Sequence, residues 1–239
     1  MGVLSDVRIL ERIYDKKLTI NPFIYDHIQP SSIDLTLDNK IQIPKSGLDS
    51  NINVYDQDIK DYFEERTFDQ HILLEPGDFI IGEVRETIGL YRDMVGNIQN
   101  RNSLIRLGIN VGLSTYINPG YHGKLPIVIN NLGKFNVNLV PGMRICQLVI
   151  SDVEPEPERD YSQQNDAKYI GEKGKGLSKL YLDKEFEEFL KIHNKTKIVE
   201  ADSADLIKFL ENRLESRSVD ITIELSNEEK RKLGLLRHD

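Results

Sequence analysis

The fold of this chain is organised around Asn100-Arg101-Asn102-Ser103-Leu104-Ile105-Arg106-Leu107-Gly108, followed by Tyr116-Ile117-Asn118-Pro119-Gly120-Tyr121-His122-Gly123. The first stretch places two guanidinium groups, a hydroxyl and an amide close together, and arginine binds phosphate oxygens bidentately at any useful pH. The second contains Asn-Pro-Gly, which favours a turn because Pro fixes φ and Gly adopts a positive φ. Taken alone, these residues fit a phosphate site or a solvated arginine pair beside an ordinary hairpin.

Short strands separated by turns flank this region on both sides. Ile33, Leu35 and Leu37 alternate with polar residues, as in a half-buried strand. Strand-like patterns return at 72–74, 79–90, 95–98 and 144–150, whereas residues 45–70 are polar and acidic without periodicity and are predicted to be an insertion. Because no helical pattern intervenes between residues 72 and 150, we predict an all-β barrel or sandwich, not a parallel α/β sheet.

Helical patterns lie only near the two ends of the chain. Ser5 and Asp6 can cap a first helix, with an apolar face made of Val7, Leu10, Ile13 and Tyr14. Residues 184–239 carry two further helical patterns, a short alternating strand at 219–223 and a last helix with a capping box. We therefore expect a mainly β domain followed by a small α/β appendage.

Composition excludes several classes of function. The chain has 239 residues and a net charge of −8, which argues against general nucleic-acid binding because that needs a basic surface. No apolar run approaches the length of a membrane span, and no signal-peptide pattern is present. The lone Cys146 suits a reducing compartment and, among apolar neighbours, a packing role. We expect a cytoplasmic protein without nucleic-acid or membrane partners, in which a local basic pocket would hold an anionic ligand.

These motifs, in this order, resemble those of the dCTP deaminase and trimeric dUTPase family. The family text is close to Arg-Ser-Ser-x-x-Arg-x-Gly, followed by Ile-Asp-x-Gly-aromatic-x-Gly. Asp166-Ala167-Lys168-Tyr169 resembles the lid of the dCTP deaminase branch. The resemblance covers residues 1–183, of which 154–183 would be linker and lid. It implies a distorted β-barrel of the dUTPase type, assembled as a homotrimer with active sites shared between neighbouring subunits.

The resemblance also implies which residues bind a deoxynucleoside triphosphate. The matching positions are Arg101, Ser103 and Arg106 for the triphosphate, Gln147 on a later strand, and Tyr161, Lys168 and Tyr169 in the lid. The histidines show no ligand spacing, so no protein metal site is expected. Mg²⁺ would be bound mainly through the triphosphate, since this ion rarely needs a dedicated protein cage.

Several positions depart from the family pattern. Asn118 stands where the hydrolases carry the Asp that orients and deprotonates water, and Val128 stands where the deaminases carry a general-base Glu. Valine cannot transfer a proton, and an amide can orient water but cannot deprotonate it. In addition, Asn102 replaces the first Ser of the usual pair, Glu172 replaces the usual lid Gln, and the loop after Gly108 is about one residue shorter than in the deaminase pattern.

Two functions remain open on this sequence. The first is a nucleotide-binding protein with impaired catalysis, acting as a sensor, sequestering protein or regulator, with residues 184–239 available to a protein partner. The second is a working enzyme that deaminates dCTP, hydrolyses dUTP, or does both. Loss of both proton-handling residues favours the first, whereas the usual activity of the family favours the second.

Overall fold

The computed structural model describes residues 2–45, 52, 59–112, 116–164, 167–171, 176–183 and 185. The chain divides into two compact units, Met1–Lys179 and Leu180–Asp239. In the second unit only residues 180–183, which include the 3₁₀ helix η4 (Leu180–Leu182), and Glu185 are described. The predicted appendage thus lies outside the described residues except for Glu185, and the boundary at residue 183 stays a prediction.

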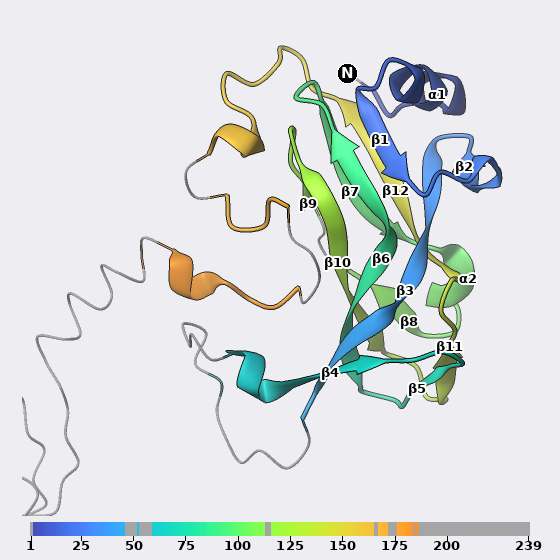
Figure 1. Cartoon of the computed structure of the whole chain (residues 1–239). Coiled ribbons are helices and arrows are strands. Elements are labelled where there is room, and N and C mark those ends of the chain that lie inside the picture. Colours follow the sequence, from blue (N-terminus) through green and yellow to red (C-terminus); the bar gives the residue numbers. More distant parts are fainter. Residues whose placement is uncertain are drawn as a thin grey trace, which may run out of the picture. The chain divides into compact units, whose positions relative to one another are not determined.

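The first unit is mainly β, as predicted (Figure 1). Its strands are β1 (Leu18–Asn21), β2 (Ile28–Gln29), β3 (Ser32–Pro44), β4 (Phe63–Thr67), β5 (Ile72–Leu74), β6 (Phe79–Leu90), β7 (Met94–Asn100), β8 (Ile109–Val111), β9 (Tyr116–Ile117), β10 (His122–Asn131), β11 (Val137–Leu139) and β12 (Arg144–Asp152). Its helices are α1 (Asp6–Tyr14) and α2 (Asn102–Ile105), with 3₁₀ turns η1 (Tyr25–His27), η2 (Ile59–Tyr62) and η3 (Tyr161–Gln163).

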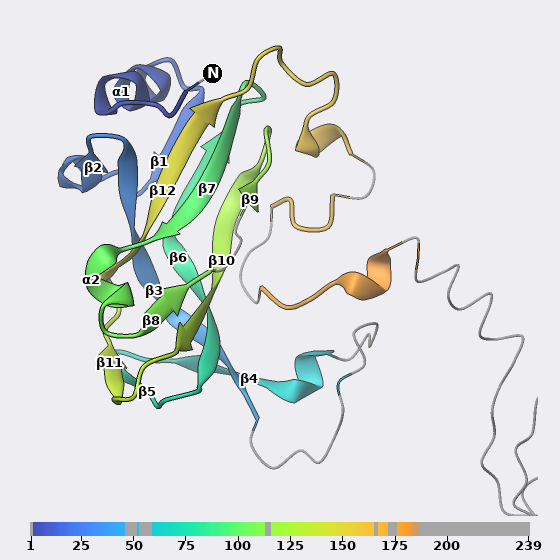
Figure 2. The ribbon, with the colours of Figure 1, turned by 180° about the vertical axis from the view of Figure 1, so that it is seen from behind.

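The main sheet runs in the order β8-β10-β6-β3-β12-β7-β9, with β1 added to β6 and with β2 and β4 added to β3. Its strands pair antiparallel and curl into a half-barrel, while β5 and β11 form a separate small ladder (Figures 1 and 2). The predicted distorted barrel of the dUTPase type is confirmed, and a parallel α/β sheet is excluded for this unit.

The core lies inside the curl and follows strand periodicity. On β10, Leu125, Ile127 and Ile129 are buried at every second position, as expected for a strand with one face inward. Cys146 on β12 is fully buried, and burial raises the pKa of its thiol far above the ordinary value. A buried neutral thiol is a poor nucleophile, which agrees with the predicted packing role.

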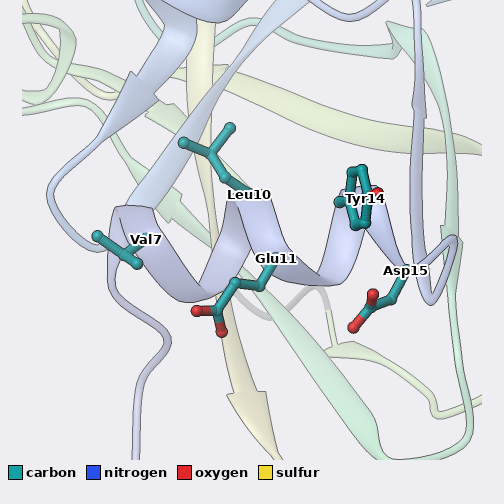
Figure 3. A pocket seen from close by; sticks show the side chains of 5 residues that line it. All are labelled: Val7, Leu10, Glu11, Tyr14 and Asp15. Atoms are coloured by element: carbon teal, nitrogen blue, oxygen red, sulfur yellow. The ribbon is translucent and has the colours of Figure 1, made fainter.

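Helix α1 begins as predicted but presents a different face to the core. Ser5 is the N-cap, and its hydroxyl accepts a hydrogen bond from the backbone N–H of Arg8. Ile9 is the buried residue, whereas Tyr14 is 87% exposed. A surface hollow of about 380 Å³ lies along the helix. Figure 3 labels the side chains that line it, which are Val7, Leu10, Glu11, Tyr14 and Asp15. The predicted apolar face thus lies at the surface with Val7, Leu10 and Tyr14 along this hollow, whereas Ile9 and the preceding Leu4 make the inward contacts.

Two further expectations are corrected. The acidic stretch 45–70 contains β4, which pairs with β3 although its side chains are mostly exposed and give no apolar alternation. The interval between residues 72 and 150 contains α2, a single helical turn too short to show a 3.6-residue period.

Candidate functional site

The hairpin between β9 and β10 forms the turn that Asn-Pro-Gly predicts. The backbone N–H of Tyr121 donates to the carbonyl of Asn118 at 3.1 Å, and Gly120 has φ +80°. A Cβ on Gly120 would lie 2.7 Å from Cγ of Asp160, so this position needs glycine both for its φ and for the close approach of the chain that precedes the lid. Tyr121 is buried, and its hydroxyl donates to the carbonyl of Lys124 at 2.8 Å.

Residues 161–179 are called the lid here, and described residues of this segment contact the hairpin. The backbone N–H of Tyr161 donates to the carbonyl of Pro119 at 2.8 Å, and that of Gly171 donates to the carbonyl of His122 at 3.0 Å. The rings of Tyr121 and Tyr161 stack with centroids 6.5 Å apart. These contacts dock the described part of the lid onto the turn.

Within the lid, Tyr169 connects its beginning to its end. The backbone N–H of Tyr169 donates to the hydroxyl of Tyr161 at 3.1 Å, and the Tyr169 hydroxyl accepts from the backbone N–H of Lys179 at 3.3 Å. The ammonium of Lys179 lies 4.9 Å from the centre of the Tyr169 ring and donates to the carbonyl of Lys168. Glu172 falls within residues 172–175, outside the described part of the chain.

A cavity of about 240 Å³ lies between the hairpin and the lid. Three of the residues singled out from the sequence, Asn118, Tyr161 and Tyr169, line it. Its other walls are Tyr116, Ile117, Tyr121, Leu125, Pro126 and Gly176. The cavity is bounded mainly by aromatic and apolar groups with a few polar atoms, which is the usual make-up of a small-molecule pocket.

Gly176 closes the cavity on the side of the sheet. A Cβ at this position would lie 2.3 Å from Cβ of Pro126 and 3.1 Å from Cγ2 of Ile81, so the lid backbone rests directly on β10 and β6. We call this side of β6 and β10 the lid face; Ile81 and Glu83 of β6 lie on it together with Pro126 and Val128 of β10. Val128 is 39% exposed there and pairs with Ile81 across the strands.

The arginine motif lies elsewhere on the unit. Arg101 caps α2, and its guanidinium donates to the carbonyl of Arg144 at 2.9 Å and lies 3.8 Å from Asp34. Asn102, Ser103 and Arg106 are exposed on the short helix. Arg101 is thus held by the fold, whereas Arg106 projects from it.

Gln147 belongs to the same region as Arg101. Its amide donates to Asp34 at 3.1 Å and to Ser32 at 3.3 Å, and Arg144 forms an ion pair with Asp34 at 2.9 Å. Asp34 is only 2% exposed and is surrounded by these donors. A buried carboxylate held by several charge-assisted bonds has a structural role.

One chain does not bring the two halves of the candidate site together. The cavity lining contains Asn118, Tyr161 and Tyr169 but none of Arg101, Ser103, Arg106 or Gln147. Figures 1 and 2 show α2 on one side of the sheet and η3, with the start of the lid, on the other. Within one chain these two groups of residues therefore do not line a common cavity.

Comparison with known proteins identifies the family. The sequence model of dCTP deaminase-like proteins matches residues 3–153. The chain belongs to this family. It is 36% identical over 183 residues to the "dCTP deaminase, dUMP-forming" of Methanothermobacter thermautotrophicus, covering 72% of this chain and 90% of that one. It is 32% identical over 190 residues to the dCTP deaminase of Haloarcula marismortui, covering 77% and 97%.

Solved structures agree with this assignment. The dCTP deaminase of Agrobacterium tumefaciens aligns with a TM-score of 0.50 at 25% sequence identity, covering 62% of this chain and 48% of that one. The aligned region thus spans about half the length of that deaminase.

Two site features were missed by sequence reasoning. Tyr121 stands at the aromatic position of the hairpin motif, so the motif itself could have indicated it. Glu83 follows an apolar run on β6, where strand alternation suggests a solvated position, yet it is only 8% exposed. Its burial depends on neighbouring strands far apart in the sequence, which no local pattern reveals.

Among the described residues, no group of three or more His, Cys, Asp and Glu side chains is arranged to hold a metal ion. No helix in the described ranges is long and apolar enough to cross a membrane.

Proposed function

We propose that this member of the dCTP deaminase-like family binds pyrimidine deoxynucleoside triphosphates between hairpin and lid, with impaired catalysis. The main support for this proposal is the cavity that is lined by Asn118 of the turn and by Tyr161 and Tyr169 of the lid. The turn offers main-chain donors and acceptors to the edge of a base, and the tyrosines offer flat apolar surfaces. Relatives covered almost end to end carry the name dCTP deaminase, which supports a pyrimidine nucleotide as the ligand.

The phosphates would be bound by the other half of the site, supplied by a neighbouring subunit. Arg101, Ser103 and Arg106 would hold the triphosphate with Lys168 of the lid, and Gln147 would support this region through Asp34. Three cations facing a polyanion form charge-assisted hydrogen bonds, which are stronger than neutral ones. This arrangement requires a closed ring of subunits, and we propose a homotrimer. Mg²⁺ would be held by the phosphates, because the described residues offer it no cluster of ligands.

Asn118 and Val128 are the basis for proposing impaired catalysis. Asn118 lines the cavity and can orient water but cannot accept its proton, and Val128 has no group that can do so. General acid–base assistance contributes about 10²–10⁴-fold, so its loss leaves slow turnover, not none. A sensing, sequestering or regulatory role follows, in which residues 184–239 would contact a protein partner.

The second candidate is an enzyme that deaminates dCTP or hydrolyses dUTP at ordinary rates. The names of the relatives favour it, since several are called dCTP deaminase, dUMP-forming. It would require another group to replace the missing proton acceptors.

A nucleotide panel tests the proposal. We expect dCTP and dUTP to raise the melting temperature of the full chain, and the corresponding monophosphates to raise it much less, because only a ligand that binds the native state stabilises it. Equal shifts with mono- and triphosphates would show that the arginine motif takes no part. No shift with any pyrimidine nucleotide would contradict the proposed function.

Closure of the lid can be tested at Gly176. We expect Gly176→Ala to lower triphosphate affinity about tenfold, since overpacking typically costs about 1–3 kcal/mol and 1.4 kcal/mol corresponds to tenfold. Gly171→Ala is the matched control: its φ of +64° resembles the +53° of Gly176, but nothing lies within 4 Å of its added Cβ. Calorimetric titration of both variants isolates the contact from the backbone strain. Equal losses in the two variants would show that packing on Pro126 does not matter.

A further inference from the structure

Glu83 is a buried carboxylate on the lid face that the proposed site does not otherwise use. It pairs with Pro126 across the strands, and Ile81 pairs in the same way with Val128. Glu83 and Val128 are therefore diagonal neighbours on one face of two adjacent strands, with Cα atoms about 7–8 Å apart. The long glutamate side chain can bridge much of this separation.

Glu83 is not itself a lining residue of the cavity, but two observations place it next to the cavity wall. Its cross-strand partner Pro126 forms part of the cavity wall. Gly176 of the lid rests on Pro126 and on Ile81, which lies two positions before Glu83 on β6. Within the described residues the Glu83 carboxylate has no hydrogen-bond partner, and the residue is only 8% exposed. Its oxygens are not fully shut off from solvent. A largely buried carboxylate without a fixed partner is costly for a fold, which is typical of a group retained for function.

The nearest cation does not form an ion pair with Glu83, because Lys124 pairs with Asp38 instead. Lys124 forms an ion pair with Asp38, and although burial opposes it, this contact lowers the pKa of Asp38. Burial raises the pKa of the Glu83 carboxyl above its ordinary value, with Lys124 opposing this effect and Asp38 adding to it. Lys40 on β3 and Glu65 on β4 also act on Glu83, and Arg85 on β6 acts on Asp38. A carboxyl with a raised pKa is a better proton acceptor than an exposed glutamate.

We propose that Glu83 is the proton acceptor for the slow deamination that persists in this chain without a carboxylate at position 128. The inference rests on the proposed function. Oxygen of a water molecule forms a bond to C4 of the cytosine ring, and the proton released passes to Glu83. The C4–N4 bond then breaks, and the amino group leaves as ammonia with that proton. The remaining proton of the added hydroxyl passes to N3, which gives the C4 carbonyl and N3–H of uracil. The reaction consumes dCTP and water and yields dUTP and ammonia.

Glu83→Gln tests this role in the full-length protein. We expect dCTP turnover to fall by at least tenfold, with dCTP affinity unchanged within about twofold, since general acid–base assistance contributes about 10²–10⁴-fold. The turnover of the parent should rise as the pH passes through the pKa of Glu83, and this limb should be absent in Glu83→Gln. Glu75→Gln, the same substitution at an exposed residue of the turn between β5 and β6, is expected to change neither quantity more than about twofold.

Folding of the variant can be separated from its chemistry. A carboxyl whose pKa is raised in the folded state destabilises the fold as the pH rises above its unfolded pKa of about 4.3. Glu83→Gln should therefore melt at a higher temperature than the parent at neutral pH, and the difference should vanish below pH 4. A merely structural Glu83 would give the opposite sign.

These experiments distinguish failure of the Glu83 role from failure of the proposed nucleotide-binding function. If the parent binds no triphosphate, the function itself fails. If it binds dCTP but turnover equals the uncatalysed rate, or if Glu83→Gln matches the parent in rate and pH profile, only the role of Glu83 is overturned.

Discussion

Replacing Asn118 by Asp is expected to raise dUTP hydrolysis by about 10²–10⁴-fold, the usual contribution of a positioned general base. The side chain lines the cavity, and the turn that carries it is closed by main-chain atoms, so the exchange of an amide for a carboxylate leaves the backbone intact. The expected product is dUMP with release of pyrophosphate, measured by chromatography. Asn138→Asp, at an exposed position of β11, should leave the rate unchanged.

Val128→Glu should increase dCTP deamination by a smaller factor than this. A carboxylate at position 128 would lie diagonally from Glu83, so the two like charges would disfavour each other's ionised form. The hairpin loop after Gly108 is also about one residue shorter than in the deaminase pattern. A larger gain from Val128→Glu than from Asn118→Asp would show that the loop already positions the cytosine ring correctly.

Arg106→Ala should weaken triphosphate binding by at least tenfold, because a hydrogen bond to a charged group contributes about 1.5–3 kcal/mol. Arg106 is exposed on α2, so the substitution should spare the fold. Arg101 is a less suitable target, since its guanidinium also holds Arg144 and Asp34. Arg8→Ala, on the exposed side of α1, is the matched control, and titration calorimetry measures all three proteins.

Mixing subunits extends this test to the shared site. Arg106→Ala damages the phosphate half and Tyr169→Ala damages the lid half, so neither variant alone has an intact site. In a cyclic trimer with heterologous contacts, a random equal mixture should regain tight binding at about one quarter of the sites. If mixing restores none, each site is formed within a single chain.

The sequence predicted those features that depend on local chemistry. The Asn118 turn, the Ser5 cap and the existence of β3 follow from residue types a few positions apart. The half-buried alternation predicted for β3 is not observed at its start, because residues 32–37 are all buried. Strand β4 was missed because it is an edge element with exposed side chains, which carry no apolar period.

The remaining features depend on contacts between distant segments. From the sequence, Glu83 is expected to be solvated, but β3, β4 and β10 bury it in the fold. Gly176 is expected to be an ordinary flexible glycine, but in the fold its backbone lies directly on Pro126. Tyr14 belongs to the apolar face predicted for α1, but it is exposed because Leu4 and Ile9 make the contacts with the core. The separation of the two site halves likewise appears only in three dimensions.

The most direct test of the account is a titration of the full chain with dCTP, in which bound nucleotide and product are measured in the same sample. The account predicts saturable binding of the triphosphate and conversion well below the range of about 1–10³ s⁻¹ that is typical of enzymes. Absence of saturable binding, or conversion of dCTP within that range, would contradict it.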